Sequence, residues 1–466
     1  MNESHAIADE KYEFKSGTRS KLVIAFVAGL VLFILGVFMA KSGGHEEGAV
    51  EGKKEHAAAE VSKNLTASVA QEAAHEGEHK EGGEHEGTAP WLKRIYTTLW
   101  MNNVFFTGLG LIGIFFVAIQ YAAQAGWSAG IKRIPLAMAH WIPFAGILML
   151  GLWFVVKGDI FHWTHSNIYG EFLSDGTKNP HWDKILQGKS AFFFWPLAAG
   201  TFPIFFIARM VVFFGLWYMF FIWIKKEMLA EDIDGAIEHW HTSRKLSAIF
   251  LIIFGYSSSI VAWDWVMSID THWFSTMMGW YVFASWWVTG LAVITFIVIS
   301  LKKEGYLKVV NANHIHDLGK FVFAFSIFWT YIWFSQFMLI FYANIPEETV
   351  YFVQRRAVAP YSWIFFANLI LNFVLPFLLL MTRDAKRQIT MLQVVCPIVI
   401  IGHWLDYYMM VTPGVMMGEG GIGFLEIGTA VMFMAAFLLV TLSSLSKFPL
   451  IPKHDPMLQE SLGHHI

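Results

Sequence analysis

Two stretches of this sequence, SSSIVAWDWVMSIDTHW (Ser257–Trp273) and VIIGHWLDYYMMV (Val399–Val411), place carboxylates among aromatic residues at the ends of long apolar runs. Each run is long enough to cross a bilayer. An ionisable group inside a membrane-spanning helix is costly unless it is paired or hydrated, so Asp264 and Asp406 are candidate functional residues. Together the two stretches predict a membrane protein that handles protons, a polar ligand or both.

The composition of the chain supports a membrane protein. Of its 466 residues, 56% are hydrophobic and 15% are charged, whereas a soluble domain has about 25% charged residues. The chain contains ten apolar stretches of about 18 residues or more, at 22–40, 98–122, 134–156, 203–224, 245–265, 277–301, 319–342, 361–381, 391–411 and 423–445. We therefore expect an all-α membrane protein of about ten transmembrane helices, with no room for a soluble catalytic domain and no nucleic-acid signature.

The distribution of Lys and Arg predicts the orientation. If the N-terminus is cytoplasmic, nineteen of these residues lie on the inner side, against six in the short outer loops, as the positive-inside rule requires. Both termini are then cytoplasmic, in a multi-pass protein of a bacterial inner membrane. The expected parts are an N-terminus with an anchor span that is retained (1–40), an outer low-complexity loop rich in His, Glu and Gly (41–97), the polytopic membrane domain (98–445) and a cytoplasmic tail (446–466).

Spans two to five resemble spans six to nine. The motif FFIAR (Phe205–Arg209) aligns with IFFAN (Ile364–Asn368), and AWDWVM (Ala262–Met267) aligns with WLDYYM (Trp404–Met409). A repeat of four spans keeps its orientation, so its pseudo-axis lies along the membrane normal. The repeat predicts two four-helix bundles, flanked by spans one and ten.

The chain has one cysteine, Cys396. Cysteine-ligated iron–sulfur clusters, CxxCH haem attachment and multi-cysteine zinc sites all need more thiolates. A haem held by His140 and His403 is disfavoured because their expected depths differ by about 9 Å. We expect no haem, no iron–sulfur cluster, no metal and no covalently bound cofactor.

Arg209 in span four and Asp264 in span five have similar expected depths. A buried arginine with a carboxylate partner is typical of a neutralised structural pair. It is equally compatible with a site for a polar head group or a proton acceptor, and the sequence leaves both interpretations open.

A second candidate group is formed by His403, Asp406 and Glu426. His403 and Asp406 share one face of span nine, and Glu426 begins span ten at comparable depth. Three ionisable groups within reach of one another could relay protons toward the outer surface. Satisfied structural contacts are the alternative interpretation.

His140 is the third candidate, close to the inner end of span three. With Asp317 and Lys320 near the inner end of span seven, it could begin an inward-facing proton path. The alternative is a core histidine bonded to a neighbouring backbone. At the outer end of span three, His162, His165 and Asp159 could bind a metal, but an interfacial belt of His and Trp is the commoner arrangement.

Three long runs are similar to a known family: WDWVMSIDTHWFSTMMGWYVFA (Trp263–Ala284), HDLGKFVFAFSIFWTYIWFSQFMLIFYANIPEET (His316–Thr349) and NLILNFVLPFLLLMTRDAKR (Asn368–Arg387). They resemble the F-type membrane subunit of bacterial alternative complex III, a quinol:cytochrome c oxidoreductase. That subunit is grouped with the polysulfide-reductase-type membrane anchors, whose core is a pair of four-helix bundles. The likeness covers about residues 98–445.

The resemblance implies partners as well as a fold. They are a paralogous membrane subunit, an iron–sulfur subunit, multihaem cytochrome c subunits and the lipid bilayer, and a haem–copper oxidase is compatible as a further partner. A menaquinone- or ubiquinone-type quinol is the implied ligand of the complex, but no quinone-binding residue can be assigned in this chain. We therefore expect a cofactor-free subunit, not catalytic alone, that contributes to quinol-linked proton handling and assembly. The alternatives are a standalone proton- or ion-coupled secondary transporter and a purely structural scaffold.

Overall fold

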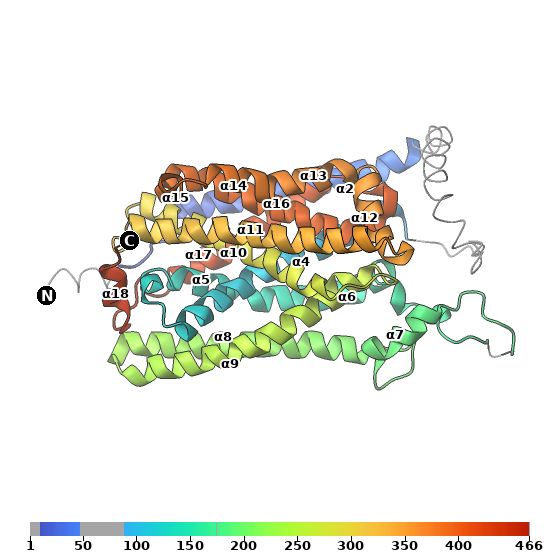
Figure 1. Cartoon of the computed structure of the whole chain (residues 1–466), viewed down its shortest axis with the longest axis horizontal. Coiled ribbons are helices and arrows are strands. Elements are labelled where there is room, and N and C mark those ends of the chain that lie inside the picture. The colour runs from blue at the N-terminus through green and yellow to red at the C-terminus, as the bar shows by residue number, and fades with distance from the viewer. Residues whose placement is uncertain (1–9, 47–87, 174, 466) are drawn as a thin grey trace.

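The computed structural model describes residues 10–46, 88–173 and 175–465. The described residues are 79% helical and form no strand (Figure 1). The His- and Glu-rich loop predicted from the sequence falls mostly at 47–87, outside the described residues, so its role stays a prediction.

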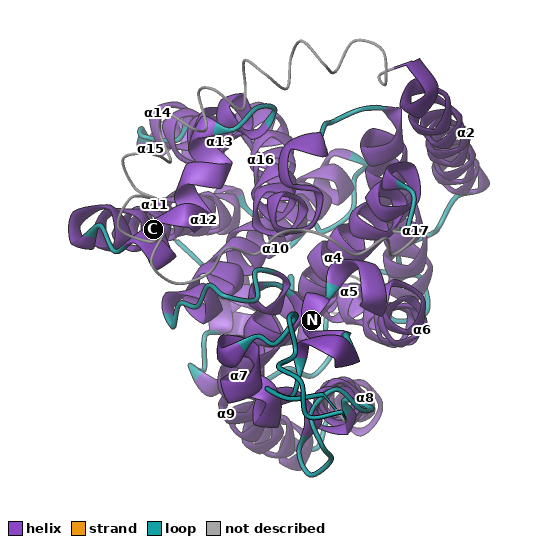
Figure 2. Ribbon diagram, turned by 90° about the vertical axis from the view of Figure 1, so that its right-hand side faces the viewer, coloured by secondary structure: helices purple, strands orange, loops and turns teal. Residues whose placement is uncertain are grey.

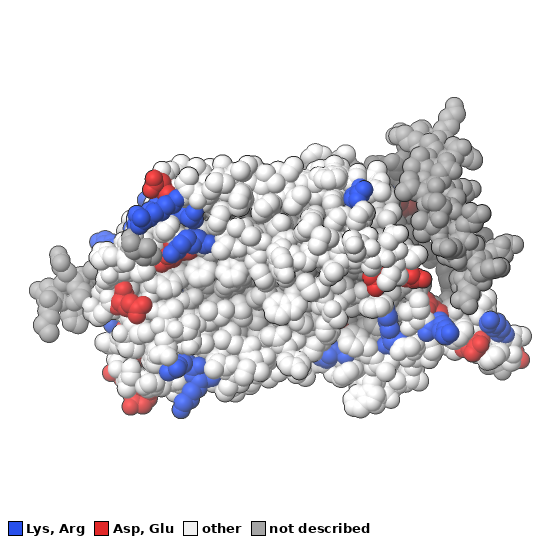
Figure 3. Space-filling view, in the orientation of Figure 1, with Lys and Arg blue, Asp and Glu red and all other residues white. Residues whose placement is uncertain are grey.

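Ten helices among the described residues are long and apolar enough to cross a membrane, which confirms the predicted fold class. The space-filling view shows a broad band without charged side chains, with Lys, Arg, Asp and Glu gathered toward the two ends of the molecule (Figure 3). The spans in chain order are α2 (Ser16–Glu46), α4 (Pro90–Ala122), α5 (Arg133–Met138) with α6 (Ile142–Ile160), α8 (Ile204–Asp234), α9 (Ile237–Trp265), α10 (Met277–Lys303), α11 (Ala312–Ala343), α13 (Tyr361–Leu369) with α14 (Leu375–Leu379), α16 (Ile389–Met416) and α17 (Phe424–Leu445).

The spans form the two expected four-helix bundles (Figure 2). In bundle one, α4 packs on α6 and α9, and α8 packs on α6 and α9. In bundle two, α10 packs on α11 and α16, and the α13–α14 span packs on α11 and α16. The bundles meet through α4, α9, α10 and α16, while α2 and α17 pack on each other at the side of α4.

A short helix covers one end of each bundle and extends the repeat beyond its spans. In bundle one, α7 (Lys184–Phe194) precedes α8. In bundle two, α12 (Pro346–Ala357) precedes α13 in the corresponding place. The sequence did not predict α12, because a helix of 12 residues with charged residues in its first and last turns carries no transmembrane signal.

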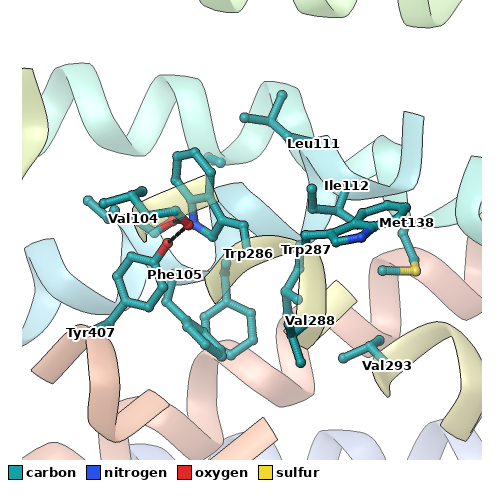
Figure 4. Close-up of a cluster of buried hydrophobic side chains, with 14 of the residues drawn as sticks. Val104, Phe105, Leu111, Ile112, Met138, Trp286, Trp287, Val288, Val293 and Tyr407 are labelled. Atoms are coloured by element: carbon teal, nitrogen blue, oxygen red, sulfur yellow. Dashed lines mark hydrogen bonds between the residues drawn. The ribbon is translucent and has the colours of Figure 1, made fainter. Parts of the chain in front are cut away.

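The innermost layer consists of α4 and α10, the two most buried spans. Trp286 of α10 lies against α4, and its indole N–H donates to the carbonyl of Val104 at 3.2 Å (Figure 4). Gly108 is required at this contact, since a Cβ there would lie 1.7 Å from the Trp286 ring. The Trp404 indole of α16 also donates to the Asn102 side-chain oxygen of α4 at 3.0 Å, so the junction of the two bundles is closely packed and hydrogen-bonded.

The described ends of the chain meet at the end of the bundles opposite α7 and α12. Lys11 pairs with Pro449, and the Leu450 N–H donates to the carbonyl of Glu10 at 2.9 Å. The predicted C-terminal tail is an ordered segment here, because Asp455 accepts from the buried ammonium of Lys132 at 2.9 Å. Two short helices, α15 (Arg383–Arg387) and α18 (Leu458–Leu462), lie at this same end.

Candidate functional site

Asp406 lies at the centre of bundle two with no exposed surface. Its carboxylate accepts three hydrogen bonds from three different helices: the Tyr281 hydroxyl on α10, the Trp329 indole N–H on α11 at 2.9 Å and the Asn368 amide on α13 at 2.9 Å. All four spans of bundle two therefore supply a side chain to this group, since α16 carries Asp406 and the other three spans carry its hydrogen-bond donors.

No lysine or arginine among the described residues forms an ion pair with Asp406. All three of its hydrogen-bond donors are neutral side chains, and the nearest basic group is His403, one turn earlier on α16, with Nδ1 at 3.8 Å. An ionised carboxylate without a cation is costly in a dry interior. The carboxylate is therefore held by neutral donors, and an imidazole is the only basic group within 4 Å of it among the described residues.

His403 is the basic side chain next to this carboxylate. Its Nδ1 is hydrogen-bonded to the Ser285 hydroxyl at 3.0 Å, and its ring packs edge-to-face against the Trp329 ring. The other ring nitrogen, Nε2, is buried and has no hydrogen-bond partner among the described residues. A fully paired structural histidine would use both nitrogens, so one ring nitrogen of His403 is left available for a further hydrogen bond.

Span eight is deformed beside this carboxylate. The turn Ile370–Val374 is a π-helix, and Asn372 within it donates to Asn368 at 2.5 Å. Gly402 on α16 faces this turn, since a Cβ there would lie 2.3 Å from the Asn372 amide oxygen. Single π turns are frequent at functional sites. Here the Asn372 amide donates to the Asn368 amide, which in turn donates to Asp406.

A small cavity connects the Asp406 site to the end of the bundle under α12. Its volume is about 20 Å³, which is enough for about one water molecule. Tyr281 and Asn368, both bound to Asp406, line one part of it, and Arg355 and Gln336 line another. The Gln336 amide nitrogen is buried without a partner among the described residues, so it offers a bound water a donor.

Arg355 of α12 closes the far side of this cavity. It donates to the carbonyls of Met409 and Met410 and pairs with Asp270 at 2.8 Å. Burial raises the pKa of Asp270, although the Arg355 guanidinium acts in the opposite direction. A row of polar groups therefore leads from Asp406 to this end of the molecule. It consists of Tyr281, the cavity and the Arg355–Asp270 pair.

The corresponding carboxylate of bundle one is neutralised. Arg209 on α8 binds Asp264 on α9 through two parallel hydrogen bonds of 2.8 and 2.7 Å, and donates to the carbonyl of Phe192. The repeat is thus reproduced in space, because Arg209 meets Asp264 where Asn368 meets Asp406. The pair agrees with the structural interpretation, and the exchange of Arg for Asn is what leaves Asp406 without a cation.

Glu426 does not join His403 and Asp406, contrary to the expected group of three. Its carboxylate binds Arg94 at 2.6 and 2.8 Å and accepts from the Gly423 N–H at 2.8 Å. Glu426 therefore caps the first turn of α17 and fixes it to α4. The prediction was wrong because Arg94 was assigned to a loop, whereas α4 begins at Pro90.

His140 is likewise separate from Asp317 and Lys320. Its Nδ1 lies 3.1 Å from the carbonyl of Ala137, as the backbone-bonded alternative predicts, and its Nε2 lies 2.8 Å from the ammonium of Lys225. Asp317 pairs instead with Lys320 and with His464 of the C-terminal segment. The expected start of an inner proton path at these three residues is therefore not assembled.

At the α7 end, four titratable side chains gather around the first bundle. The rings of His162 and His165 lie 5.3 Å apart, and His272 contacts Asp183 at 2.5 Å. Burial and the neighbouring His165 lower the pKa of His162. Among the described residues, no three His, Cys, Asp or Glu side chains come together as a metal site.

Sequence reasoning missed Tyr281, Trp329 and Arg355 as neighbours of the Asp406 site. A hydroxyl, an indole and a loop arginine carry no motif, and only the helix packing brings them together. The repeat did offer a signal for Asn368, since it aligns with Arg209. No family model matches the chain, and no curated protein matches it.

Proposed function

We propose that this chain is a cofactor-free membrane subunit of a quinol:electron-acceptor oxidoreductase, in which Asp406 holds and relays a proton. The observation that carries the proposal is the carboxylate of Asp406, which is buried, bound by three neutral donors and accompanied only by an imidazole. A group in this setting changes charge by exchanging a proton with its surroundings.

The route toward the α12 end supports the proton-handling part. A hydroxyl, two amides and a cavity for about one water lie between Asp406 and Arg355. Chains of this kind pass protons by re-forming hydrogen bonds, with no movement of the backbone. The Arg355–Asp270 pair then forms the last polar contact before the surface.

The quinol-oxidising partner rests on the resemblance of the three long runs described above. Quinol oxidation releases protons, and a buried carboxylate beside a hydrated cavity is a suitable acceptor. Electrons would be carried by the iron–sulfur and haem subunits of the complex. The role proposed for this chain is therefore proton transfer and assembly.

The first test is purification of the protein from its native membrane in mild detergent. We expect mass spectrometry and haem absorbance to detect an iron–sulfur subunit and a multihaem cytochrome in the same particle. A stable protein that is isolated alone would contradict the proposal and favour a standalone proton- or ion-coupled transporter.

The second test compares Asp406→Asn with Asp264→Asn in the assembled complex. Asparagine keeps the shape of the side chain but binds no proton, so we expect Asp406→Asn to reduce quinol-linked proton release by about ten-fold or more. Asp264→Asn changes the equivalent carboxylate of bundle one and should affect stability instead. If both variants lower the amount of complex but leave turnover per assembled complex unchanged, the chain is a scaffold.

A further inference from the structure

A second cavity lies in bundle one, between α7 and the end of α9. Its volume is about 290 Å³, close to the lower limit for ligand sites. Side chains from α7, from the turn around Trp163 and from the segment after α9 line it, and most of them are aromatic or aliphatic. It corresponds to the small cavity under α12, since Met267 lines the first and Met409, its repeat partner, lines the second.

The wall of this cavity is mainly aromatic. Trp163, Trp263 and Trp273 line it, and the indole nitrogen of each is buried in the wall and not open to the cavity. The indoles therefore offer apolar ring surface, which matches a ligand with an apolar part such as an acyl chain.

Lys189 supplies the positive charge at this site. Its ammonium donates to the carbonyl of Thr271 at 2.8 Å and has two further protons available. No Asp or Glu in the described part of the chain lines the cavity. The carboxylate of Asp183, the N-cap of the same helix, is already bound by the N–H groups of Ile185 and Leu186 and by His272.

The rim of the cavity carries exposed aromatic side chains. Phe192 and Phe274 line the cavity and are exposed, as is Trp195, which follows α7. Two lining residues touch the ion pair of bundle one, since Phe192 contacts the Arg209 guanidinium and Ser268 donates to the backbone of Asp264. A half-buried lysine within an aromatic rim is the arrangement that proteins use at the boundary between acyl chains and head groups.

We propose that this cavity binds the glycerol-phosphate end of an anionic phospholipid. The phosphate lies at Lys189, and the first part of one acyl chain packs among the aromatic side chains. A quinol fits less well, because it is neutral and leaves the charge of Lys189 without a counter-ion in the cavity. The inference is independent of the function proposed above, since it concerns the other bundle.

The test uses the full-length protein, purified in a neutral detergent and depleted of lipid. Short-chain phosphatidylglycerol, phosphatidylcholine and a short-tailed benzoquinone are titrated separately, and bound molecules are counted by native mass spectrometry. We expect one phosphatidylglycerol to bind more tightly than phosphatidylcholine. One lysine near a lipid surface accounts for about a five-fold preference.

Two pairs of variants locate the binding site. Gly188→Leu fills the cavity from α7, where an added Cβ meets nothing within 4 Å, and Gly151→Leu adds the same side chain at an equally open position on α6. Lys189→Met removes the charge, and Lys184→Met does so on the exposed face of the same helix. We expect Gly188→Leu to weaken binding about ten-fold, and Lys189→Met to abolish the preference for the anionic lipid.

Three outcomes would overturn the proposal. The first is equal phosphatidylglycerol binding by Gly188→Leu and Gly151→Leu, which places the lipid elsewhere. The second is an unchanged preference for the anionic lipid in Lys189→Met. The third is binding of the benzoquinone, and not of the phospholipid, that Gly188→Leu abolishes, which assigns the cavity to a quinone.

Discussion

At the scale of single residues, the two bundles use the same aspartate position in opposite ways. Asp264 has an arginine partner with two hydrogen bonds, whereas Asp406 has an asparagine, a tyrosine and a tryptophan. A buried ion pair adds little net stability, but loss of one partner leaves an uncompensated charge. One substitution between the repeats, Arg209 against Asn368, therefore separates an ion-paired carboxylate from one held by neutral donors.

The ion pair in bundle one is open to a double-mutant cycle. Arg209→Met leaves Asp264 buried and unpaired, so we expect it to lower the free energy of unfolding by about 3–5 kcal/mol. Combining it with Asp264→Leu should recover most of that loss, apart from about 1–3 kcal/mol for the Phe192 carbonyl that Arg209 no longer satisfies. Thermal unfolding in detergent measures the three variants, and additive losses would contradict the expected coupling.

At the scale of the helical elements, α7 is held at its first turn by Asp183. The carboxylate accepts from the N–H groups of Ile185 and Leu186 at 2.9 and 3.0 Å and contacts His272. Burial opposes ionisation, but the Leu186 N–H, His272 and the Ile185 N–H outweigh it and lower the pKa of Asp183 below its ordinary value of 3.8. Because the folded pKa is lowered, this stabilisation is present above pH 3.8 and is lost as the pH falls through the folded value.

We therefore predict that the protection of α7 amides against hydrogen exchange falls steeply only below pH 3.8. Asp183→Ala should weaken the helix by about 1 kcal/mol at neutral pH, as expected for a lost N-cap. Asp183→Asn keeps an accepting oxygen and serves as the control, with protection that no longer depends on acid in this range. An acid response of the same size in Asp183→Asn would assign the effect to another group.

The attachment of α2 is a second feature at this scale. Little of α2 is buried, and it packs mainly on α17 through close backbone contacts at Gly29 and Gly428. A Cβ on Gly29 would lie 2.7 Å from the Met432 nitrogen and 2.8 Å from the Gly428 carbonyl oxygen. Small residues that let two backbones approach are a common basis of helix association in membranes.

We predict that Gly29→Leu destabilises the contact between α2 and α17 by about 1–3 kcal/mol. Faster hydrogen exchange confined to these two helices would be the direct measurement. Gly17→Leu is the matched control, because a Cβ at Gly17 meets nothing within 4 Å. Equal exchange in the two variants would show that the glycine contact does not hold α2 in place.

At the scale of the whole molecule, the sequence predicted the architecture well. Ten spans, two four-helix bundles and the outer pair follow from hydropathy and from the repeat, because the bilayer leaves few alternatives for an apolar chain. Two side-chain pairs could also be predicted from the sequence. Arg209 and Asp264 have similar depths in neighbouring spans, and His403 and Asp406 have an i, i+3 spacing on one helix.

The rest depended on how helices rotate about their axes, which no periodicity in this nearly all-apolar sequence defines. Glu426 was grouped with Asp406 on depth alone, but α17 turns it toward Arg94. His140 was grouped with Asp317, but Lys225 and the C-terminal segment take these partners. Tyr281 and Trp329 cannot be told from other aromatic residues in the sequence, because only the packing of the bundle brings their polar atoms to the Asp406 carboxylate.

The contact between the first and last spans has a mechanical consequence. Near the N-terminal end, α2 packs on α17, and Glu10 and Lys11 are joined to Pro449 and Leu450. A force applied to Glu10 loads these contacts first. A force applied to the C-terminal end instead first loads the ion pairs of His464 with Asp317 and of Asp455 with Lys132, so we expect the two ends of the chain to detach under different forces.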